Sequence, residues 1–368
     1  MIKKERGSIR LGSVLGIEVD LHYSWFIILA LLMFSLSTGF FPVYYPDMTQ
    51  TAVWILGGVS AFLLFASVFL HELMHCLVAK ANRMHVDKIT LFFFGGVAQI
   101  PGENLTPKKE FKMAISGPLF SLALGLMFFM VYKYSPYLYL TAICSYLWRV
   151  NIILAVFNMV PGFPLDGGRV FRSILWHFYR DIKKATRIAA YGGKIFAIFL
   201  IVTGFAGMVF GGYGGFWFVV LGFFLYFIAG ASYEQIILKE LLSKVHVKEL
   251  MLKKPIGVKD DITVADLFSK FLELRHESFL VIKGKEIVGI VSLQSIKNIP
   301  KADWQRIKVS DVMTKDIKAV SPEDNMFNAL MKMTEYNVDI LPVRKDGKIE
   351  GILSRDDILH YVRIKNTV

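Results

Sequence analysis

The stretch VWILGGVSAFLLFASVFLHELMHCLVAK, residues 53–80, decides what kind of protein this chain is. It is an apolar run long enough to cross a bilayer, for which a helix needs roughly 20 residues. Yet it holds His71, Glu72 and His75 in an H-E-x-x-H pattern. An ionisable residue inside a spanning helix is costly unless it serves a function or meets a partner. The stretch therefore predicts a membrane helix that carries a functional polar site.

The rest of the chain also favours a membrane protein. Hydrophobic residues make up 54% of its 368 residues, and the mean hydropathy is +0.49, which is too high for an ordinary soluble protein. With the run above, six crossings are expected, because further apolar runs cover 22–41, 112–132, 138–159, 188–210 and 215–237. Residues 1–238 hold 30 charges, whereas the 130 residues that follow hold 42. We therefore expect a membrane domain at 1–238 followed by a water-soluble part. Disorder, collagen and a disulfide scaffold are excluded.

The connections between the apolar runs indicate the orientation in the membrane. The N-terminus and the connections 80–112 and 160–187 contain four, six and six Lys or Arg residues, while the alternate connections contain one or none. Basic connections lie on the cytosolic side. The pattern predicts a multi-pass protein of the cell membrane with both termini and the soluble part in the cytosol. The net charge of +12 forms no single basic stripe, so nucleic acid is not an expected partner.

The H-E-x-x-H pattern is typical of a zinc site. Histidines four residues apart share one face of a helix and can bind one zinc ion, with the glutamate placed to activate the metal's water. A third ligand is expected in NMVPGFPLDGG, residues 158–168, where prolines and glycines break the helix before Asp166. The alternatives are two interfacial histidines with a structural glutamate, and an aspartate that only makes a turn. Glu103 is a rival third ligand, whose replacement would spare zinc if Asp166 is correct.

At this point the residues resemble the site-2 proteases, a family of intramembrane zinc metalloproteases. The H-E-x-x-H at 71–75 and the Asn-x-x-Pro-x-x-Pro-Leu-Asp-Gly at 158–167 are similar to the two signatures of that family, in its order. The resemblance covers about residues 1–238. It implies one zinc per chain on His71, His75 and Asp166, with Glu72 as the general base and Asn158 as the catalytic residue that holds the scissile peptide or its oxyanion. It also implies membrane-bound or membrane-associated protein substrates, cut near the cytosolic side in regulated intramembrane proteolysis.

Two further segments are similar to parts of that family. FFFGGVAQ, residues 92–99, resembles a strand that offers a backbone edge to an unwound substrate, which implies substrate contacts at Gly95, Gly96 and Val97. The alternative is a plain interfacial hairpin. SGPL, residues 116–119, resembles a Gly-Pro motif, but Ser121 stands where many members have Asn. A polar contact near the site is therefore expected to differ.

The soluble part contains an internal repeat. Residues 247–308 and 309–368 match at an offset of 62 without a gap, and each reads strand, helix, strand, strand, helix. This resembles a tandem pair of α/β CBS domains, which implies binding of ATP or another adenine nucleotide and a homo-oligomer formed through these modules. Ser354 and Asp357 match the family's ribose-binding pattern, but the first repeat has Ser292 and Ser295 and lacks the aspartate. One nucleotide site is expected. The alternative is a dimerisation module that binds nothing.

The predicted fold is therefore a polytopic α-helical membrane protein of about six transmembrane helices, followed by the CBS pair. The predicted function is a zinc metalloendopeptidase. Alternative functions are a nucleotide-gated transporter and a catalytically silent membrane scaffold. A transporter would spread ionisable residues along a path near the midplane, often in repeated halves, whereas this chain clusters them at one site. The intact His71, Glu72, His75 and Asp166 argue against a silent scaffold.

Overall fold

The protein consists of two compact units, Met1–Glu234 and Gln235–Val368. The computed structural model describes residues 7–86, 88–92, 95–99, 105–211, 214–253, 257–274, 278–284, 286–297, 299–315, 319–336, 338–346 and 348–367. Each unit is considered by itself below.

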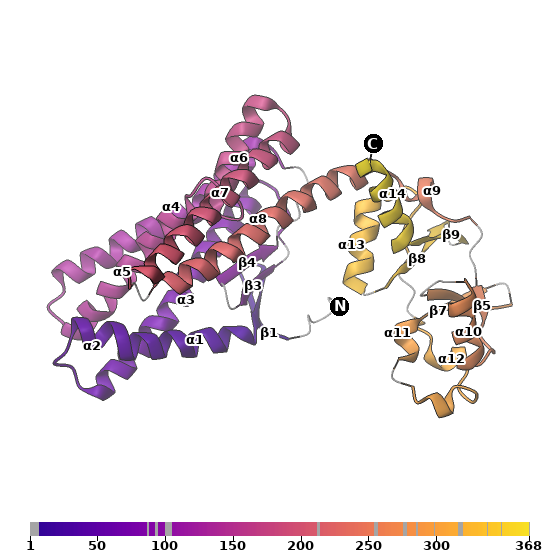
Figure 1. Cartoon of the computed structure of the whole chain (residues 1–368), viewed down its shortest axis with the longest axis horizontal. Coiled ribbons are helices and arrows are strands. Elements are labelled where there is room, and N and C mark those ends of the chain that lie inside the picture. Colours follow the sequence, from indigo (N-terminus) through magenta and orange to yellow (C-terminus); the bar gives the residue numbers. More distant parts are fainter. Residues whose placement is uncertain are drawn as a thin grey trace. The chain divides into compact units, whose positions relative to one another are not determined.

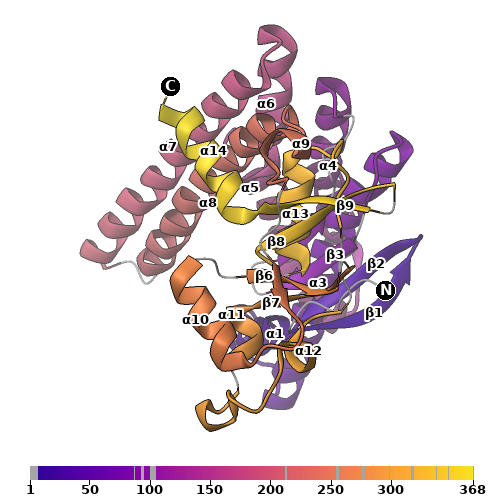
Figure 2. The ribbon, with the colours of Figure 1, turned by 90° about the vertical axis from the view of Figure 1, so that its right-hand side faces the viewer.

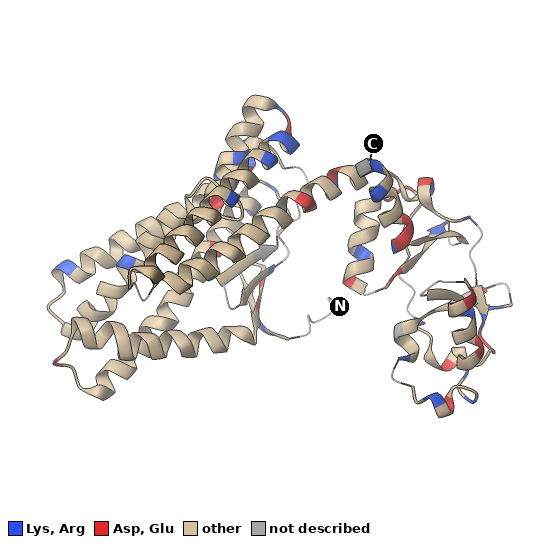
Figure 3. Ribbon diagram, in the orientation of Figure 1, with Lys and Arg blue, Asp and Glu red and all other residues tan. Residues whose placement is uncertain are grey.

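The first unit is built on helices long and apolar enough to cross a membrane (Figure 1). Within the described ranges these spans are six: Ser24–Tyr44, which joins α1 (Ser24–Ser35), the π-helical turn η1 (Leu36–Phe40) and α2 (Phe41–Tyr44), then α3 (Gln50–Ala81), α4 (Pro107–Tyr134), α5 (Leu138–Asn158), α7 (Ile182–Val209) and α8 (Gly215–Ser243). Charged residues gather mainly towards the helix ends (Figure 3). The six-helix prediction is confirmed.

Helix α3 is the longest of the spans, with 32 residues. The hydroxyl of Thr49 accepts a hydrogen bond from the Ala52 N–H at its first turn, and the Asn82 side chain donates to the Val78 carbonyl at its last. At ~1.5 Å per residue a helix of this length measures about 48 Å, which exceeds the hydrocarbon core of about 30 Å. His71 lies ten residues before the end of α3, and therefore about 15 Å inward from it.

A four-stranded sheet lies against α3, in the order β1-β2-β3-β4. It contains β1 (Ser8–Val14), β2 (Ile17–His22), β3 (Lys88–Phe92) and β4 (Gly95–Gln99). The segment before the first span pairs in parallel with the segment after α3, with Val19 opposite Ile89. Leu21, Leu91 and other apolar strand residues pack with Leu73 and Cys76 of α3. Sequence reasoning expected a strand only near 92–99 and missed the N-terminal hairpin, whose partner is distant along the chain.

The broken segment after α5 is held on α7 and leads into α6 (Asp166–Tyr179). The Phe163 N–H donates a hydrogen bond to the Ala189 carbonyl at 3.2 Å. The two backbones touch because glycines face each other: a Cβ on Gly162 would meet the Gly193 backbone, and a Cβ on Gly193 would meet the Phe163 carbonyl. The first residue of α6 is therefore positioned by backbone packing on a spanning helix.

The second unit contains two similar α/β repeats (Figure 2). The first is built from β5 (Gly257–Lys259), α10 (Val264–Leu274), β6 (Ser278–Lys283), β7 (Glu286–Ser292) and α11 (Leu293–Ile296), and the second from α13 (Met326–Tyr336), β8 (Ile340–Lys345), β9 (Lys348–Ser354) and α14 (Arg355–Thr367). Short helices α9 (Val247–Leu250), η2 (Lys301–Asp303) and α12 (Val309–Val312) complete it.

The two repeats of this unit meet through an apolar cluster. Each repeat has a core of its own, and Leu280 and Ile290 of the first pack with Ile340 and Ile352 of the second. In the second repeat an isolated β-bridge between Val320 and Val343 takes the place of the three-residue strand β5 of the first repeat. The α/β fold predicted for the repeats is confirmed.

The contact at Gly193 leads to a test. We expect Gly193→Ala to destabilise the protein by about 1 to 3 kcal/mol, the usual cost of overpacking, because the new methyl group would meet the Phe163 carbonyl. Gly207→Ala on the same helix is the matched control, since its Cβ would lie 3.5 Å from the Cα of Gly215, an ordinary contact. Thermal unfolding in detergent measures both variants. Equal midpoints would contradict the packing described above.

Candidate metal centre

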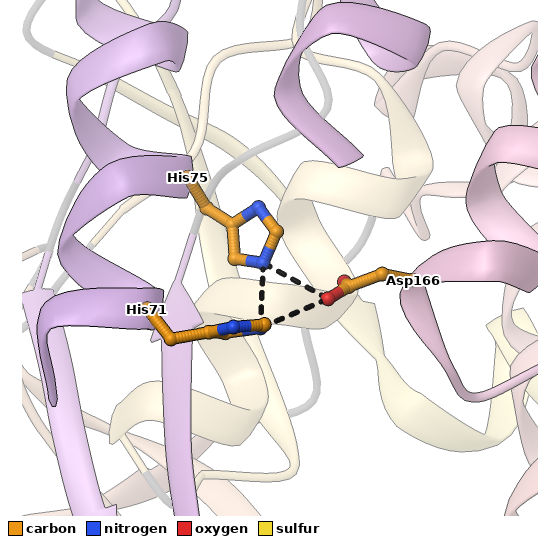
Figure 4. Close-up of side chains that lie close together, drawn as sticks. All are labelled: His71, His75 and Asp166. Carbon is orange, nitrogen blue, oxygen red and sulfur yellow. Dashed lines mark hydrogen bonds and ion pairs between the residues drawn. The ribbon is translucent and has the colours of Figure 1, made fainter. Parts of the chain in front are cut away.

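Three side chains converge where α3 meets the start of α6 (Figure 4). The Nε2 atoms of His71 and His75 lie 3.2 Å apart, and each lies 3.0 Å from Oδ2 of Asp166. Both histidines are 3% exposed. Residues separated by more than 90 positions in the sequence thus present one nitrogen or oxygen each to a single point.

The geometry of this group fits a zinc ion. Tetrahedral ligands at about 2.0 to 2.2 Å from the metal lie roughly 3.3 to 3.6 Å from each other. The observed separations of 3.0 to 3.2 Å are within a few tenths of an ångström of these values. Three protein ligands leave a fourth position for water or substrate, as in catalytic zinc sites.

The other nitrogens of the two histidines are held by α4. Nδ1 of His75 donates to the Met113 carbonyl at 2.7 Å, because a carbonyl can only accept. This bond leaves the lone pair of Nε2 available to a metal. Nδ1 of His71 shares a hydrogen bond of 2.9 Å with the hydroxyl of buried Ser121. Ser121, the position where a different polar contact was expected, therefore orients a proposed ligand.

Gly117 provides the space in which the two imidazoles stand. A Cβ at this position of α4 would meet Nε2 and Cε1 of His75 and would lie 2.7 Å from Nε2 of His71. Any larger residue would push the rings away from Asp166. Sequence reasoning had singled out the Gly-Pro motif without a role, and the structure supplies the steric reason for its glycine.

Glu72 lies next to the histidines on α3 and beside strand β4. A Cβ on Gly96 would meet Cγ of Glu72 and would lie 3.3 Å from its Cδ, and a Cβ on Gly95 would lie 3.7 Å from Val68. Two residues without side chains thus let the strand pass directly over the Glu72 turn of α3. Strand β4 ends the sheet order, and Val97 is 45% exposed. The predicted substrate strand lies next to the predicted base.

The remaining predicted residues of this site have different outcomes. Asn158 is the last residue of α5 and is half-buried, and in the described ranges its side chain makes no hydrogen bond to the three converging residues. Glu103, the rival third ligand, lies outside the described residues. Oδ2 of Asp166 faces Nε2 of both histidines, so this carboxylate supplies the third atom of the set.

A buried ion pair joins the two helices α4 and α6 next to the site, and sequence reasoning missed it. Nε of Arg172 on α6 donates to Oε1 of Glu110 on α4 at 2.9 Å, and Nη2 contacts the same oxygen. Glu110 is fully buried, and the Arg172 guanidinium lies 4.9 Å from the Phe163 ring centre. Breaking such a pair costs about 3 to 5 kcal/mol. Glu110 and Arg172 fall in two separate basic connections, and no local sequence pattern marks them as partners.

The predicted nucleotide residues lie at the start of α14. The Ser354 hydroxyl donates to Oδ2 of Asp357 at 2.5 Å, and the Asp357 N–H donates back to that hydroxyl at 3.1 Å. A cavity of about 430 Å³ lies beside the corresponding residues of the first repeat, where its lining includes Ser292, Lys297 and Trp304, and it also reaches Asp339 of the second repeat. One nucleotide site was expected, in the second repeat. The nucleotide assignment stays a prediction.

The chain is similar to known proteins over most of its length. The profile of peptidase family M50 matches residues 59–142 and 135–203, and the CBS domain profile matches 247–301 and 309–364. The chain is 32% identical to a candidate zinc metalloprotease of Synechocystis sp. over 96% of this chain and 94% of the relative. It is 30% identical to a zinc metalloprotease of Methanocaldococcus jannaschii over 97% of this chain and 96% of that relative. A solved site-2 protease from that archaeon is 30% identical, with a TM-score of 0.42, over 61% of this chain and 94% of the other.

Spanning helices bring two histidines and an aspartate to one point, which is the arrangement that a membrane-embedded zinc metalloprotease needs. The chain belongs to peptidase family M50, with a CBS domain pair attached. The resemblance to site-2 proteases, the enzyme class and the zinc cofactor predicted from the sequence are confirmed at this level. The roles of individual residues stay predictions.

The space at Gly117 can be tested directly. We expect Gly117→Ala to lower zinc affinity at least about tenfold, the lower end of what displaced supporting contacts cost, because the methyl group would push both imidazoles aside. Gly58→Ala in α3 is the control, since its Cβ would lie 3.5 Å from Met33 Sδ. Zinc per chain, measured by elemental mass spectrometry after graded chelation, should fall for Gly117→Ala alone. Equal retention in both variants would refute the steric role.

Proposed function

We propose that this chain is an intramembrane endopeptidase whose zinc ligands are His71, His75 and Asp166 and whose general base is Glu72. The observation that carries the proposal is the convergence of the three ligand atoms, all within 4.8 Å of one another, in a unit of membrane-spanning helices. The clustering at one point, rather than along a path, speaks against the transporter alternative.

The chain's own residues perform the steps of peptide hydrolysis. His71, His75 and Asp166 would hold the zinc ion, which would supply polarisation of the peptide carbonyl and of the attacking water. Glu72 would accept a proton from the attacking water and deliver it to the leaving amine. Asn158, at the end of α5, is proposed to hold the scissile peptide or its oxyanion through its amide, which supports the transition state.

Strand β4 is proposed to receive the substrate. A transmembrane helix hides its peptide groups in internal hydrogen bonds, so it must unwind before attack. Gly95, Gly96 and Val97 would then pair with the unwound stretch by strand addition. Support comes from the position of β4 at the end of the sheet order and from the contact of Gly96 with Glu72.

We propose that the substrates are membrane-bound or membrane-associated proteins cut near the cytosolic side, as in regulated intramembrane proteolysis. The metal centre lies about 15 Å from the end of α3 that leads into a basic connection, which favours the cytosolic half of the membrane. The same charge pattern supports both termini and the second unit being cytosolic. Cleavage there would release a regulator from its anchor.

Zinc content and cleavage of a candidate membrane substrate test these assignments together. We expect one zinc per wild-type chain, loss of zinc in Asp166→Ala, and retained zinc in Glu72→Gln with activity reduced about 10²- to 10⁴-fold, because only the proton transfer is removed. Glu103→Ala is the control and should keep both its zinc and its protease activity. Inside-out membrane vesicles, which expose the cytosolic face, should release the cleaved fragment to the outside.

Two results would contradict this assignment. Wild-type protein without zinc after reconstitution would overturn the metal site. Zinc loss in Glu103→Ala with zinc retained in Asp166→Ala would transfer the third ligand to Glu103.

We further propose that an adenine nucleotide bound to the CBS pair modulates the protease and that these modules form a homo-oligomer. Support comes from the match of both repeats to the CBS domain and from the cavity of about 430 Å³. Ser354 and Asp357 remain the proposed ribose contacts. Lys297 of the first repeat lines this cavity and is proposed as a phosphate contact, so a ligand centred on either repeat would depend on different residues.

Calorimetric titration of ATP into variants decides between the repeats. Asp357→Asn should weaken ATP binding about tenfold or more, because a hydrogen bond to a charged group is lost. Asp356→Asn, at the exposed neighbouring residue, is the matched control and should bind as wild type does. Loss of binding in Lys297→Ala alone would move the site to the first repeat, and a wild type that binds no ATP, ADP or AMP would refute the nucleotide proposal.

A further inference from the structure

A groove separate from the metal centre runs between the first turns of α4 and the outer face of α6. Its volume is about 330 Å³. From α4 it is lined by Lys108, Phe111 and Lys112, and from α6 by Ile174, His177 and Phe178. Phe111 and Lys112 lie three and four residues after Lys108, and His177 and Phe178 lie three and four residues after Ile174, so each helix presents one face to the groove.

The lining combines an apolar surface with positive charge. Phe111, Ile174 and Phe178 are 36%, 40% and 76% exposed. Lys108 and Lys112 are exposed as well, and among the residues that the structure describes neither forms an ion pair. Both lysines therefore remain available to an anion, beside apolar side chains that water solvates poorly.

The groove lies at a membrane surface, whichever side that surface faces. Helix α4 begins at Pro107 and is a spanning helix, so its first turns stand near the level of the lipid head groups. The apolar surface continues from Phe111 along α4, because Leu119, Leu122 and Leu126 are 54%, 40% and 50% exposed on the same side of the helix. A molecule in the groove could thus extend an apolar chain into the bilayer.

We propose that this groove binds one anionic phospholipid. Lys108 and Lys112 contact the phosphate and an acidic head group, with His177 as a further hydrogen-bond partner. The upper part of an acyl chain lies against Phe111, Ile174 and Phe178 and continues along α4. Charge complementarity selects an anion, and the continuous apolar stripe selects a lipid over a free phosphate or an acidic peptide, neither of which would use it.

A lipid in this position would connect the two helices that support the metal centre. Helix α4 supplies the Met113 carbonyl and the Ser121 hydroxyl to the histidines, and α6 begins at Asp166. The groove residues on α6 follow directly after Arg172, whose pair with Glu110 is the buried link between these helices. The bound lipid would therefore add a contact between α4 and α6 on the outer side of that ion pair.

Native mass spectrometry of the full chain in detergent tests the proposal. Phosphatidylglycerol and phosphatidylcholine with the same acyl chains are titrated separately, and bound lipid is counted. Wild type should bind phosphatidylglycerol more tightly. Lys108→Gln with Lys112→Gln should weaken phosphatidylglycerol binding about 25-fold, from about fivefold for each lysine near a lipid phosphate, while phosphatidylcholine binding stays unchanged.

Two further variants separate the groove from general charge effects. Lys133→Gln with Lys184→Gln removes the same charge from exposed positions of the same unit outside the groove and should bind as wild type does. Ile174→Trp fills the groove while keeping both lysines and should also weaken phosphatidylglycerol binding.

Several outcomes would overturn the proposal. Equal wild-type affinity for the two lipids would do so, as would an equal loss in the control pair. Displacement of the lipid by millimolar inorganic phosphate would show a free-anion site. Binding of an acidic peptide that depends on Lys108 and Lys112, without lipid preference, would show a peptide site.

Discussion

Polar groups in the middle of a membrane-spanning helix must find partners, and in this protein that need organises the first unit. A charged side chain near the centre of a bilayer costs about 3 kcal/mol or more. His71 and His75 meet this constraint with Asp166 on one side and with Ser121 and the Met113 carbonyl on the other. The same contacts that make the residues tolerable in the membrane also orient them for a metal.

The surrounding helices supply close contacts where side chains would interfere. Gly117 lets α4 approach the imidazoles, Gly96 lets β4 approach Glu72, and Gly193 lets the broken segment rest on α7. In a bilayer, helices associate through close packing and hydrogen bonds more than through apolar burial, so small residues at contacts are effective. The metal centre thus depends on the absence of side chains at three positions as much as on the presence of its ligands.

The second unit obeys a different physical rule. Each repeat buries an apolar core of its own, away from water. A smaller apolar cluster that contains Leu280 and Ile340 joins the two repeats. Duplicated sequence did not produce identical sites. Ser354 and Asp357 hydrogen-bond to each other at the start of α14, whereas Ser292 and Lys297 of the first repeat line a cavity that Asp339 of the second repeat also lines.

The sequence by itself determined the six spans, the tandem repeat and the identity of the three converging residues. These follow from local rules: run length, helical periodicity, and the need for a function to justify His71, His75 and Asp166 near a membrane. Only the tertiary structure decided which backbone groups hold the histidines, how the N-terminal hairpin joins the sheet, and that Glu110 pairs with Arg172. Those contacts join segments far apart in the chain, and their partners are chosen by packing geometry, which no local pattern encodes.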